Sequence, residues 1–166
     1  MDILIVSDTH GRQDRLVEVL RRTDAAMLLF LGDGLRDLMA VPEETVVRAV
    51  RGNCDFIGRD VPELCTESIG PCCIFMTHGH RFGVKSSVES AAIAAAQAGA
   101  DILLYGHTHQ PLHRTLPEGT VLGGCTLKKP LQIFCPGSLG EPRSGAPTFG
   151  MLTMRHGAWL LSHGEL

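Results

Sequence analysis

The chain has 166 residues, of which 44% are hydrophobic and 20% are charged, and its formal net charge is −3. This composition excludes an intrinsically disordered chain, and no apolar run approaches the ~20 residues of a membrane-spanning helix. The 15 basic residues are scattered among 18 acidic ones, so no clear nucleic-acid or membrane surface is expected. The length predicts a single domain over residues 1–166.

The first residues and the cysteines indicate the compartment. The N-terminus is acidic at Asp2, and its apolar run leads directly into a polar motif, which is not the pattern of a secretory signal. We therefore expect a cytoplasmic protein. The six cysteines include no C-x-x-C pair, and the neighbours Cys72 and Cys73 would point to opposite faces of a strand. Reduced thiols are expected.

The first third of the chain predicts a βαβ unit followed by a further strand. Ile3–Val6 is wholly apolar, as in a parallel strand buried on both faces, and apolar residues at helical spacing predict a helix over Gln13–Thr23. Ala26–Leu31 predicts the second strand. A short helix over Leu35–Ala40 and a strand over Thr45–Val50 complete this part.

The remaining two thirds have a mainly antiparallel pattern. Leu64–Ile69 and Cys72–Thr77 predict a hairpin around a Gly-Pro turn. In the alanine-rich helix that follows, Ser86 and Glu89 should form a capping box and Gly99 should end the helix. Four further strands are expected, over Ile102–Tyr105, Leu131–Phe134, Thr148–Met154 and Ala158–Ser162. The predicted class is α/β with a substantial antiparallel part.

Five of the expected strands are each followed at once by residues of the types that bind metal ions. These clusters are Asp8-Thr9-His10, Gly32-Asp33, Gly52-Asn53, His78-Gly79-His80 and Gly106-His107-Thr108-His109. Ligands of α/β sheets gather outside the carboxyl ends of the strands, so we expect the five loops to converge. Two aspartates, an asparagine and several histidines at one point predict a metal site.

The order and content of these clusters, D-x-H, G-D, G-N, H-G-H and G-H-x-H, resemble the calcineurin-like metallophosphoesterase superfamily. The third cluster continues as G-N-C-D, which is similar to the small single-domain phosphodiesterase branch, and Pro136–Arg143 looks like that branch's P-G-S-x-x-x-P-R. The resemblance implies an α/β fold in which two mixed sheets form a sandwich flanked by helices, in four layers (α/β/β/α).

The resemblance also implies how two divalent metal ions would be held. One would be bound by Asp8, His10, Asp33 and His109, and the other by Asp33, Asn53, His78 and His107, with Asp33 bridging. Four imidazoles among seven ligands argue against calcium or magnesium alone. Manganese is the expected metal, with iron, zinc, nickel and cobalt as alternatives.

These features predict a dinuclear metal-dependent phosphoesterase that hydrolyses small phosphodiesters with a metal-bridging hydroxide as nucleophile. Catalytic roles are expected for Asp33, Asn53 and Cys54, and substrate contacts for Asn53 and His78. The binding partner would be a small phosphate-ester substrate. The sequence does not decide whether the protein forms a homo-oligomer. An alternative is a metal-poor protein-interaction scaffold of the same fold, similar to the retromer subunit, and another is a single-metal structural site. The retained histidines, and a set of seven ligands without a thiolate, favour the enzyme.

Several residues have competing interpretations. In the wider superfamily a histidine at the place of Cys54 is thought to be the general acid, and a thiol, with its higher resting pKa, is a poorer one near neutrality. Activated esters should therefore be cleaved more readily than alkyl esters, although Cys54 could instead be a small buried hydrophobe. His80 could support the site or lie on the surface. Ser138 and Arg143 are expected to stabilise their loop more than to bind phosphate.

Overall fold

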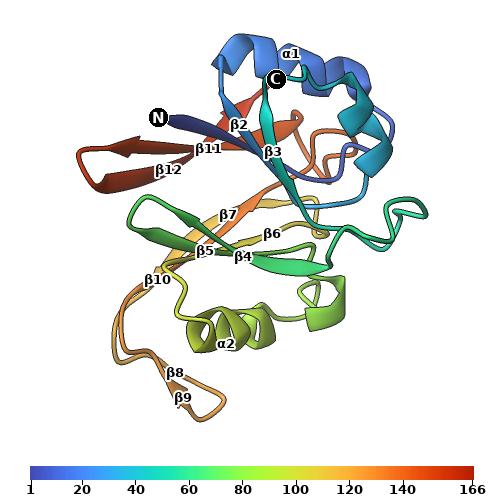
Figure 1. The fold of residues 1–166 in the computed structure, drawn as a ribbon. Helices are drawn as coiled ribbons and strands as arrows, with labels where there is room; N and C mark the ends of the chain where they lie inside the picture. The colour runs from blue at the N-terminus through green and yellow to red at the C-terminus, as the bar shows by residue number, and fades with distance from the viewer.

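The computed structural model describes residues 1–166 as two five-stranded mixed sheets that face each other (Figure 1). The first sheet has the order β12-β11-β1-β2-β3, with β1 (Asp2–Val6), β2 (Met27–Phe30), β3 (Val46–Ala49), β11 (Thr148–Arg155) and β12 (Ala158–Glu165). The second has the order β4-β5-β6-β10-β7, with β4 (Leu64–Ile69), β5 (Cys72–Thr77), β6 (Ile102–Tyr105), β7 (Pro111–Leu116) and β10 (Leu131–Pro136).

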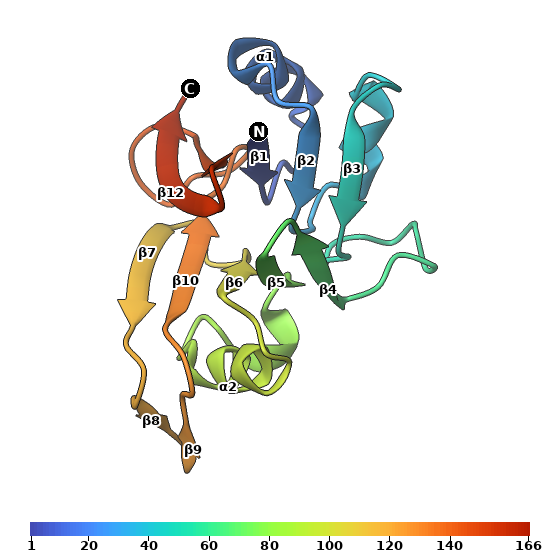
Figure 2. The ribbon, with the colours of Figure 1, turned by 60° about the vertical axis from the view of Figure 1, so that its left-hand side comes forward.

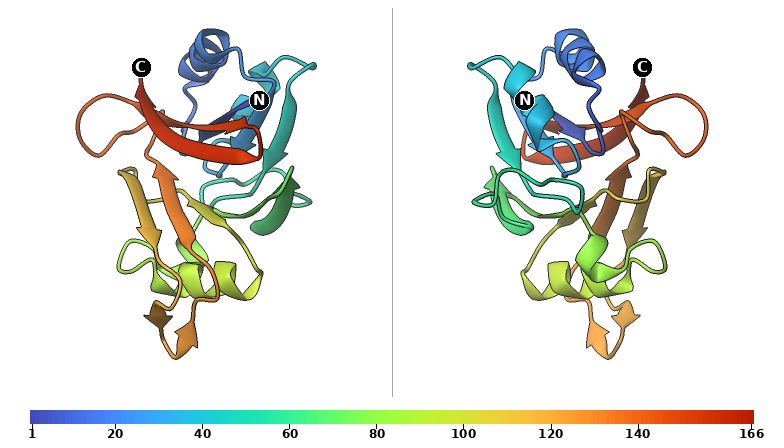
Figure 3. Two further views of the ribbon diagram at one scale, coloured as in Figure 1. Left: turned by 90° about the vertical axis from the view of Figure 1, so that its left-hand side faces the viewer. Right: turned by 90° about the vertical axis from the view of Figure 1, so that its right-hand side faces the viewer.

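Helices cover the outer faces of both sheets, so the fold has the four layers expected. Helix α1 (Gln13–Thr23) lies over the first sheet and α2 (Glu89–Gln97) over the second, as both views of Figure 3 show. The short 3-10 helices η1 (Leu35–Ala40) and η2 (His80–Phe82) lie in loops. A two-stranded ribbon, β8 (Val121–Leu122) and β9 (Cys125–Thr126), extends beyond β7 and β10 (Figure 2). No helix has the length and apolar character needed to cross a membrane.

Alternation along the central strands builds one core between the sheets and one under each helix. In β1, Ile3 and Ile5 point into the core between the sheets, whereas Leu4 and Val6 pack in the core under α1. Both faces are therefore buried, which is why the segment is wholly apolar. In β5, Cys72 lies between the sheets and Cys73 packs toward α2, and all six cysteines are unpaired.

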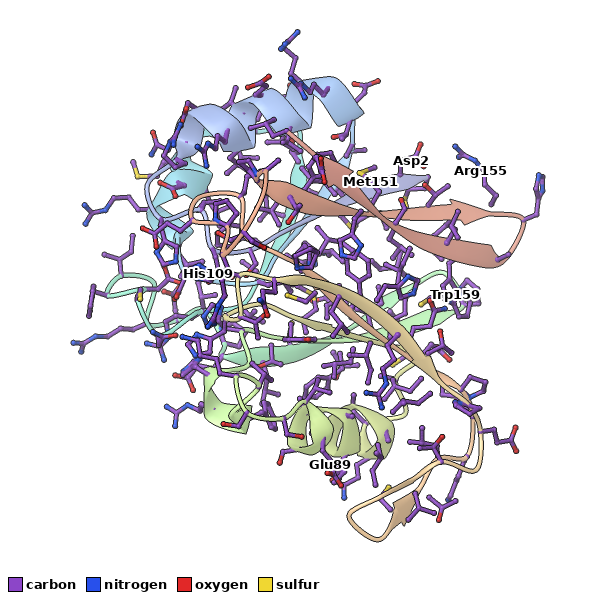
Figure 4. The ribbon with its side chains drawn as sticks, turned by 180° about the vertical axis from the view of Figure 1, so that it is seen from behind. Asp2, Glu89, His109, Met151, Arg155 and Trp159 are labelled. Atoms are coloured by element: carbon purple, nitrogen blue, oxygen red, sulfur yellow. The ribbon has the colours of Figure 1, made fainter.

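Strand direction decides where the polar loops gather. β1, β2 and β3 pair in parallel, as do β5, β6 and β10. The carboxyl ends of parallel strands lie at one edge of a sheet, and Figure 4 shows His109 at the opposite end of the strands from Asp2 and Arg155.

Most predicted elements are present, with ends shifted by at most three residues, but the capping box is wrong. Ser86 lies in a turn, where its N–H donates to the Gly83 carbonyl, and α2 begins only at Glu89, whose N–H donates to Ser87 Oγ at 3.2 Å. The other end is as expected. Gly99 has a φ of +72°, and the N–H bonds of a Schellman motif close the helix there.

β7 and the β8–β9 ribbon were not predicted as separate strands. Their residues are mixed in polarity and mostly exposed, because β7 is an edge strand and the ribbon projects from the sheets. An alternating pattern needs one buried face, and these segments have none over most of their length.

Phe134 fixes the distance between the two sheets. Its ring is fully buried, stacks on His163 of β12 with centroids 4.3 Å apart, and occupies the space that a side chain at Gly150 of β11 would fill. The fold thus depends on a large side chain from one sheet meeting small or flat ones from the other.

We predict that Phe134→Ala lowers the free energy of unfolding by about 3–5 kcal/mol, because it leaves a cavity between the sheets. Urea unfolding followed by circular dichroism measures the loss. Phe56→Ala is the matched control. Its ring is 89% exposed, so the change should stay within about 0.5 kcal/mol. Equal losses in the two variants would contradict this account of the core.

Candidate metal centre

Strand ends place two aspartates next to each other in the interior. Asp8 follows β1 and Asp33 follows β2, and their side chains are buried. Three groups of side chains could each hold a metal ion, because the ligand atoms within each group lie within 4.8 Å of one another. The groups are Asp8 with His10 and His109, His10 with Asp33 and Cys54, and Asp33 with His78 and His107. The structure therefore brings together six of the seven residues predicted as metal ligands, in three groups that overlap at His10 and Asp33.

The backbone at these positions is strained. Seven non-glycine residues have a positive φ, and five of them are predicted ligands: Asp8, His10, Asp33, His107 and His109. Left-handed conformations are unfavourable for residues with a Cβ and persist only where the surroundings impose them, which is typical of functional sites.

Backbone carbonyls fix the orientation of two histidines. His78 donates its Nδ1–H to the Leu31 carbonyl at 2.7 Å, and His109 donates its Nδ1–H to the Glu141 carbonyl at 2.6 Å. Each ring must therefore present Nε2 to the cluster, which is the arrangement of a metal-binding imidazole held by an outer partner.

Pairs of acceptors consequently face each other. His78 Nε2 lies 3.2 Å from Asp33 Oδ2, and His109 Nε2 lies 3.1 Å from Asp8 Oδ1. Asp8 Oδ1 and His78 Nε2 are buried without a hydrogen-bond partner. Buried acceptors without a donor are costly, so a positive charge must lie between them. A divalent cation fits this set of oxygen and imidazole ligands.

The close contacts between carboxylates and imidazoles also shift the pKa values of these side chains. Desolvation opposes the charged forms, yet the pKa of the Asp8 carboxyl is held well below its usual range by His10 and His109, and the pKa of Asp33 is lowered by His78. Reciprocally, Asp8 raises the pKa of His10 and His109. The cluster is an electronegative pocket that attracts either protons or metal ions.

His107 and His80 behave differently from the other histidines. Desolvation, with the charges of His78 and Lys85, lowers the pKa of His107 to about 4, so its imidazole is neutral near pH 7 and available as a ligand. The His80 ring lies 5.5 Å from the His78 ring between centroids, and desolvation and His78 lower its pKa. His80 therefore lies beside the site, partly buried, in agreement with the supporting role left open for it.

Asn53 and Cys54 lie at the exposed side of the cluster. The Asn53 amide donates to Cys54 Sγ at 3.3 Å, and the Cys54 N–H donates to Asp33 Oδ1 at 2.7 Å. Because Cys54 is exposed, its interpretation as a buried hydrophobe is wrong. Desolvation and the charges of Asp33 and Asp55 raise the pKa of its thiol to about 11, so the thiol is protonated near neutrality.

Sequence reasoning missed the residues that hold the ligand loops. Asp55 accepts the N–H groups of Asp33, Gly34, Leu35 and Gly52 at 2.8–2.9 Å. Asp37 is buried on η1 and accepts from Thr9 Oγ1 and from the Gly11 N–H, while Ser7 Oγ donates to Asp8 Oδ2. Asp55 ends the G-N-C-D motif, which could have marked it, whereas Asp37 has no comparable signal.

The glycine-rich tail supports the same loops. Ser138 Oγ donates to the Asp8 carbonyl at 2.8 Å and accepts the Glu141 N–H at 2.7 Å, so its role is structural, as expected. The Arg143 N–H donates to the His109 carbonyl, and its side chain lines a cavity of about 140 Å³ with Lys85, His107, Thr108 and His109. The positively charged residues Lys85 and Arg143 therefore lie beside the ligand cluster.

Two motif glycines are required by close approach. A Cβ at Gly52 would collide with the Asp33 carboxylate, and a Cβ at Gly106 would collide with Ser7 Oγ beside Asp8. Neither glycine has a positive φ, so the need is for space and not for conformational freedom.

Comparison with known proteins agrees with this geometry. Residues 1–157 match the family model of the calcineurin-like phosphoesterase superfamily domain. The chain belongs to this superfamily. It is 31% identical over 160 residues to the Probable metallophosphoesterase YsnB of Bacillus subtilis (strain 168), covering 95% of this chain and 87% of the relative. Phosphodiesterase YfcE of Escherichia coli (strain K12) is 29% identical over 182 residues, covering 92% and 87%.

Solved structures share the fold of this phosphoesterase. A conserved uncharacterized protein of Streptococcus pneumoniae TIGR4, described as a predicted phosphoesterase, superposes with a TM-score of 0.76 at 25% identity, covering 99% of this chain and 88% of the other. Wild type Vps29 of Entamoeba histolytica, solved in complex with Zn²⁺, gives a TM-score of 0.71 at 21% identity and covers 99% of both chains. The latter likeness concerns the fold alone.

We predict that Asp55→Asn weakens binding of a divalent metal ion at least about tenfold and destabilises the phosphoesterase by about 1–3 kcal/mol, because the amide places N–H donors against backbone N–H groups. Titration calorimetry with Mn²⁺ and thermal unfolding measure the two effects. Asp60→Asn, an exposed change on the same loop, is the control and should match the unchanged chain. Unchanged affinity in Asp55→Asn would contradict its positioning role.

Proposed function

We propose that this phosphoesterase is a dinuclear metal-dependent phosphodiesterase that acts on small phosphodiesters, with manganese as its metal. The observation that carries the proposal is the pair of facing acceptors, His78 Nε2 with Asp33 Oδ2 and His109 Nε2 with Asp8 Oδ1. Each imidazole is oriented by a backbone carbonyl, so the two contacts are built to enclose cations.

The proposed ligand set follows from this geometry. Asp8, His10, Asp33 and His109 would hold one ion, and Asp33, Asn53, His78 and His107 the other. Asp33 belongs to two of the three groups of neighbouring ligand atoms, which supports a bridging role. Asn53 is exposed next to Asp33's loop, and its amide oxygen would complete the second set.

Bound divalent ions would supply Lewis-acid stabilisation of the phosphoryl oxygens and an activated water. The chain's own residues do the rest. Lys85 and Arg143 add positive charge that attracts an anionic ester to the cluster. Asn53 is exposed and would contact the substrate, whereas the His78 side chain is fully buried, so the substrate contact expected for His78 is wrong and only its role as a metal ligand is proposed. The buried carboxylates of Asp8 and Asp33 keep the ligand atoms in place.

Two observations favour diesters with good leaving groups. YfcE, a relative with similar coverage of both chains, bears the name phosphodiesterase. The group next to Asn53 is a protonated thiol with a raised pKa and not an imidazole, so it is a weak proton donor to a departing alkoxide. Aryl oxides leave without such help.

The second candidate is a protein-interaction scaffold. The likeness to Vps29 supports it through the common fold alone. The presence of His10, His78, His107 and His109 favours the enzyme. Backbone carbonyls orient His78 and His109, and His10, His107 and His109 have a positive φ, and a scaffold has no use for either feature.

Activity tests the enzyme directly. With Mn²⁺ present, the full chain should hydrolyse bis(4-nitrophenyl) phosphate, and Asp33→Asn should lower kcat/KM by about 1000-fold or more, because it removes the bridging charge. Asp24→Asn is a matched control, since Asp24 also has a positive φ but lies at the end of α1. A rate no higher than that of Asp33→Asn would refute the proposal.

Metal content separates the candidates without an assay of activity. Elemental analysis of the purified chain after incubation with Mn²⁺ should approach two ions per chain, and Asp33→Asn should fall below one. A ratio well under one in the unchanged chain would favour the scaffold. A ratio near one would favour a single-metal site.

A further inference from the structure

A second cavity adjoins the ligand cluster on the side of the loop between β3 and β4. It has a volume of about 290 Å³ and is lined by residues that include His10, Asp33, Cys54, Arg36, Phe56 and Ile57. It shares no lining residue with the basic cavity at Lys85 and Arg143. The loop projects at the right of Figure 1, and in Figure 4 it lies on the same side of the molecule as His109. One wall of this cavity is thus the proposed reaction centre.

Part of the lining of this cavity is apolar. The Phe56 side chain is 89% exposed and that of Ile57 is 43% exposed. A single exposed aromatic residue is ordinary on a protein surface. An exposed phenyl ring in the wall of a cavity that also contains two proposed metal ligands is not, because it offers a flat apolar face at the place where an ester's substituent must lie.

The chain on both sides of this ring is anchored. Asp55, the preceding residue, accepts four backbone N–H groups from the loops of Asp33 and Gly52. On the other side, the Val61 N–H donates to the Gly58 carbonyl at 2.9 Å, and Val61 packs against the core under α1. Asp55 therefore ties the chain directly before Phe56 to the loops that carry Asp33 and Gly52.

The charges of the cavity admit an anionic ester. Its carboxylates at Asp37 and Asp55 accept hydrogen bonds from backbone N–H groups and from Thr9, which stabilise their negative charges. The Arg36 side chain is exposed and takes part in no ion pair, which adds an uncompensated positive charge to the lining. An aromatic arm carries no charge, so an ester bound at the cluster can direct such an arm into this cavity without electrostatic repulsion from its carboxylates.

We propose that Phe56, with Ile57, forms a subsite that binds an aromatic ring carried by one arm of the phosphate ester. The proposal rests on the proposed function and narrows its substrate class to phosphate esters with an aromatic arm. Stacking of the substrate ring on Phe56 contributes affinity. Because Asp55 anchors the loop, binding does not have to order a mobile segment, which would cost free energy.

Binding of phosphonates, which cannot be hydrolysed, tests the subsite apart from turnover. Titration calorimetry of the Mn²⁺-loaded full chain should give a Kd for phenylphosphonate about tenfold lower than for methylphosphonate. Phe56→Ala should reduce this ratio to near one, while Phe56→Trp should keep it. Met39→Ala is the control, because Met39 is 83% exposed on η1 and does not line the cavity.

An unchanged ratio in Phe56→Ala, or a ratio near one in the unchanged chain, overturns the subsite. So does failure of both phosphonates to bind. None of these results depends on hydrolysis, and failure of the proposed function is read separately, from the rate on bis(4-nitrophenyl) phosphate relative to Asp33→Asn. If the chain hydrolyses the diester but Phe56→Ala leaves the ratio of the two phosphonate Kd values unchanged, the proposed phosphodiesterase function is supported and only the aromatic subsite is refuted.

Discussion

Two carboxylates buried at the ends of neighbouring strands, Asp8 and Asp33, are the constraint on which the rest of this phosphoesterase depends. Transfer of a charge from water to a protein interior costs several kcal/mol, and the charge persists there only with partners. The loops after five strands supply those partners as imidazoles and N–H groups, yet the acceptor pairs at His78 and His109 still need a cation. Burial thus creates the demand for positive charge that protons or metal ions meet at this site.

The fold meets this constraint with the backbone as much as with side chains. Parallel strands bring the loops to one edge, and the loops cross each other so closely that Gly52 and Gly106 leave no room for a Cβ. Five proposed ligands adopt a positive φ. Such strain lowers stability, and the large cores on both sides of each sheet offset it.

The sequence predicts those parts of the fold and site that depend on residues close together in the chain. The apolar run of β1, the periodicity of α1 and the ligand-rich strand ends were all sufficient, because each reflects burial or chemistry within a few residues. The bonds that orient His78 and His109 reach carbonyls 47 and 32 residues away, so no local pattern shows them. Asp37 resembles a solvent-facing helix residue until the fold places Thr9 against it.

The position of β1 between β2 and β11 couples the first and last parts of the chain. β1 pairs with β11 in a register that sets Asp2 opposite Thr153, and the N–H groups of Leu139 and Gly140 donate to the carbonyls of Ser7 and Asp8. During synthesis on the ribosome, β1 can pair with β2 early, but its other edge stays open until β11 has been made. Contacts of such long sequence separation slow folding, and the N–H groups that hold the Ser7 and Asp8 carbonyls belong to the same late part of the chain.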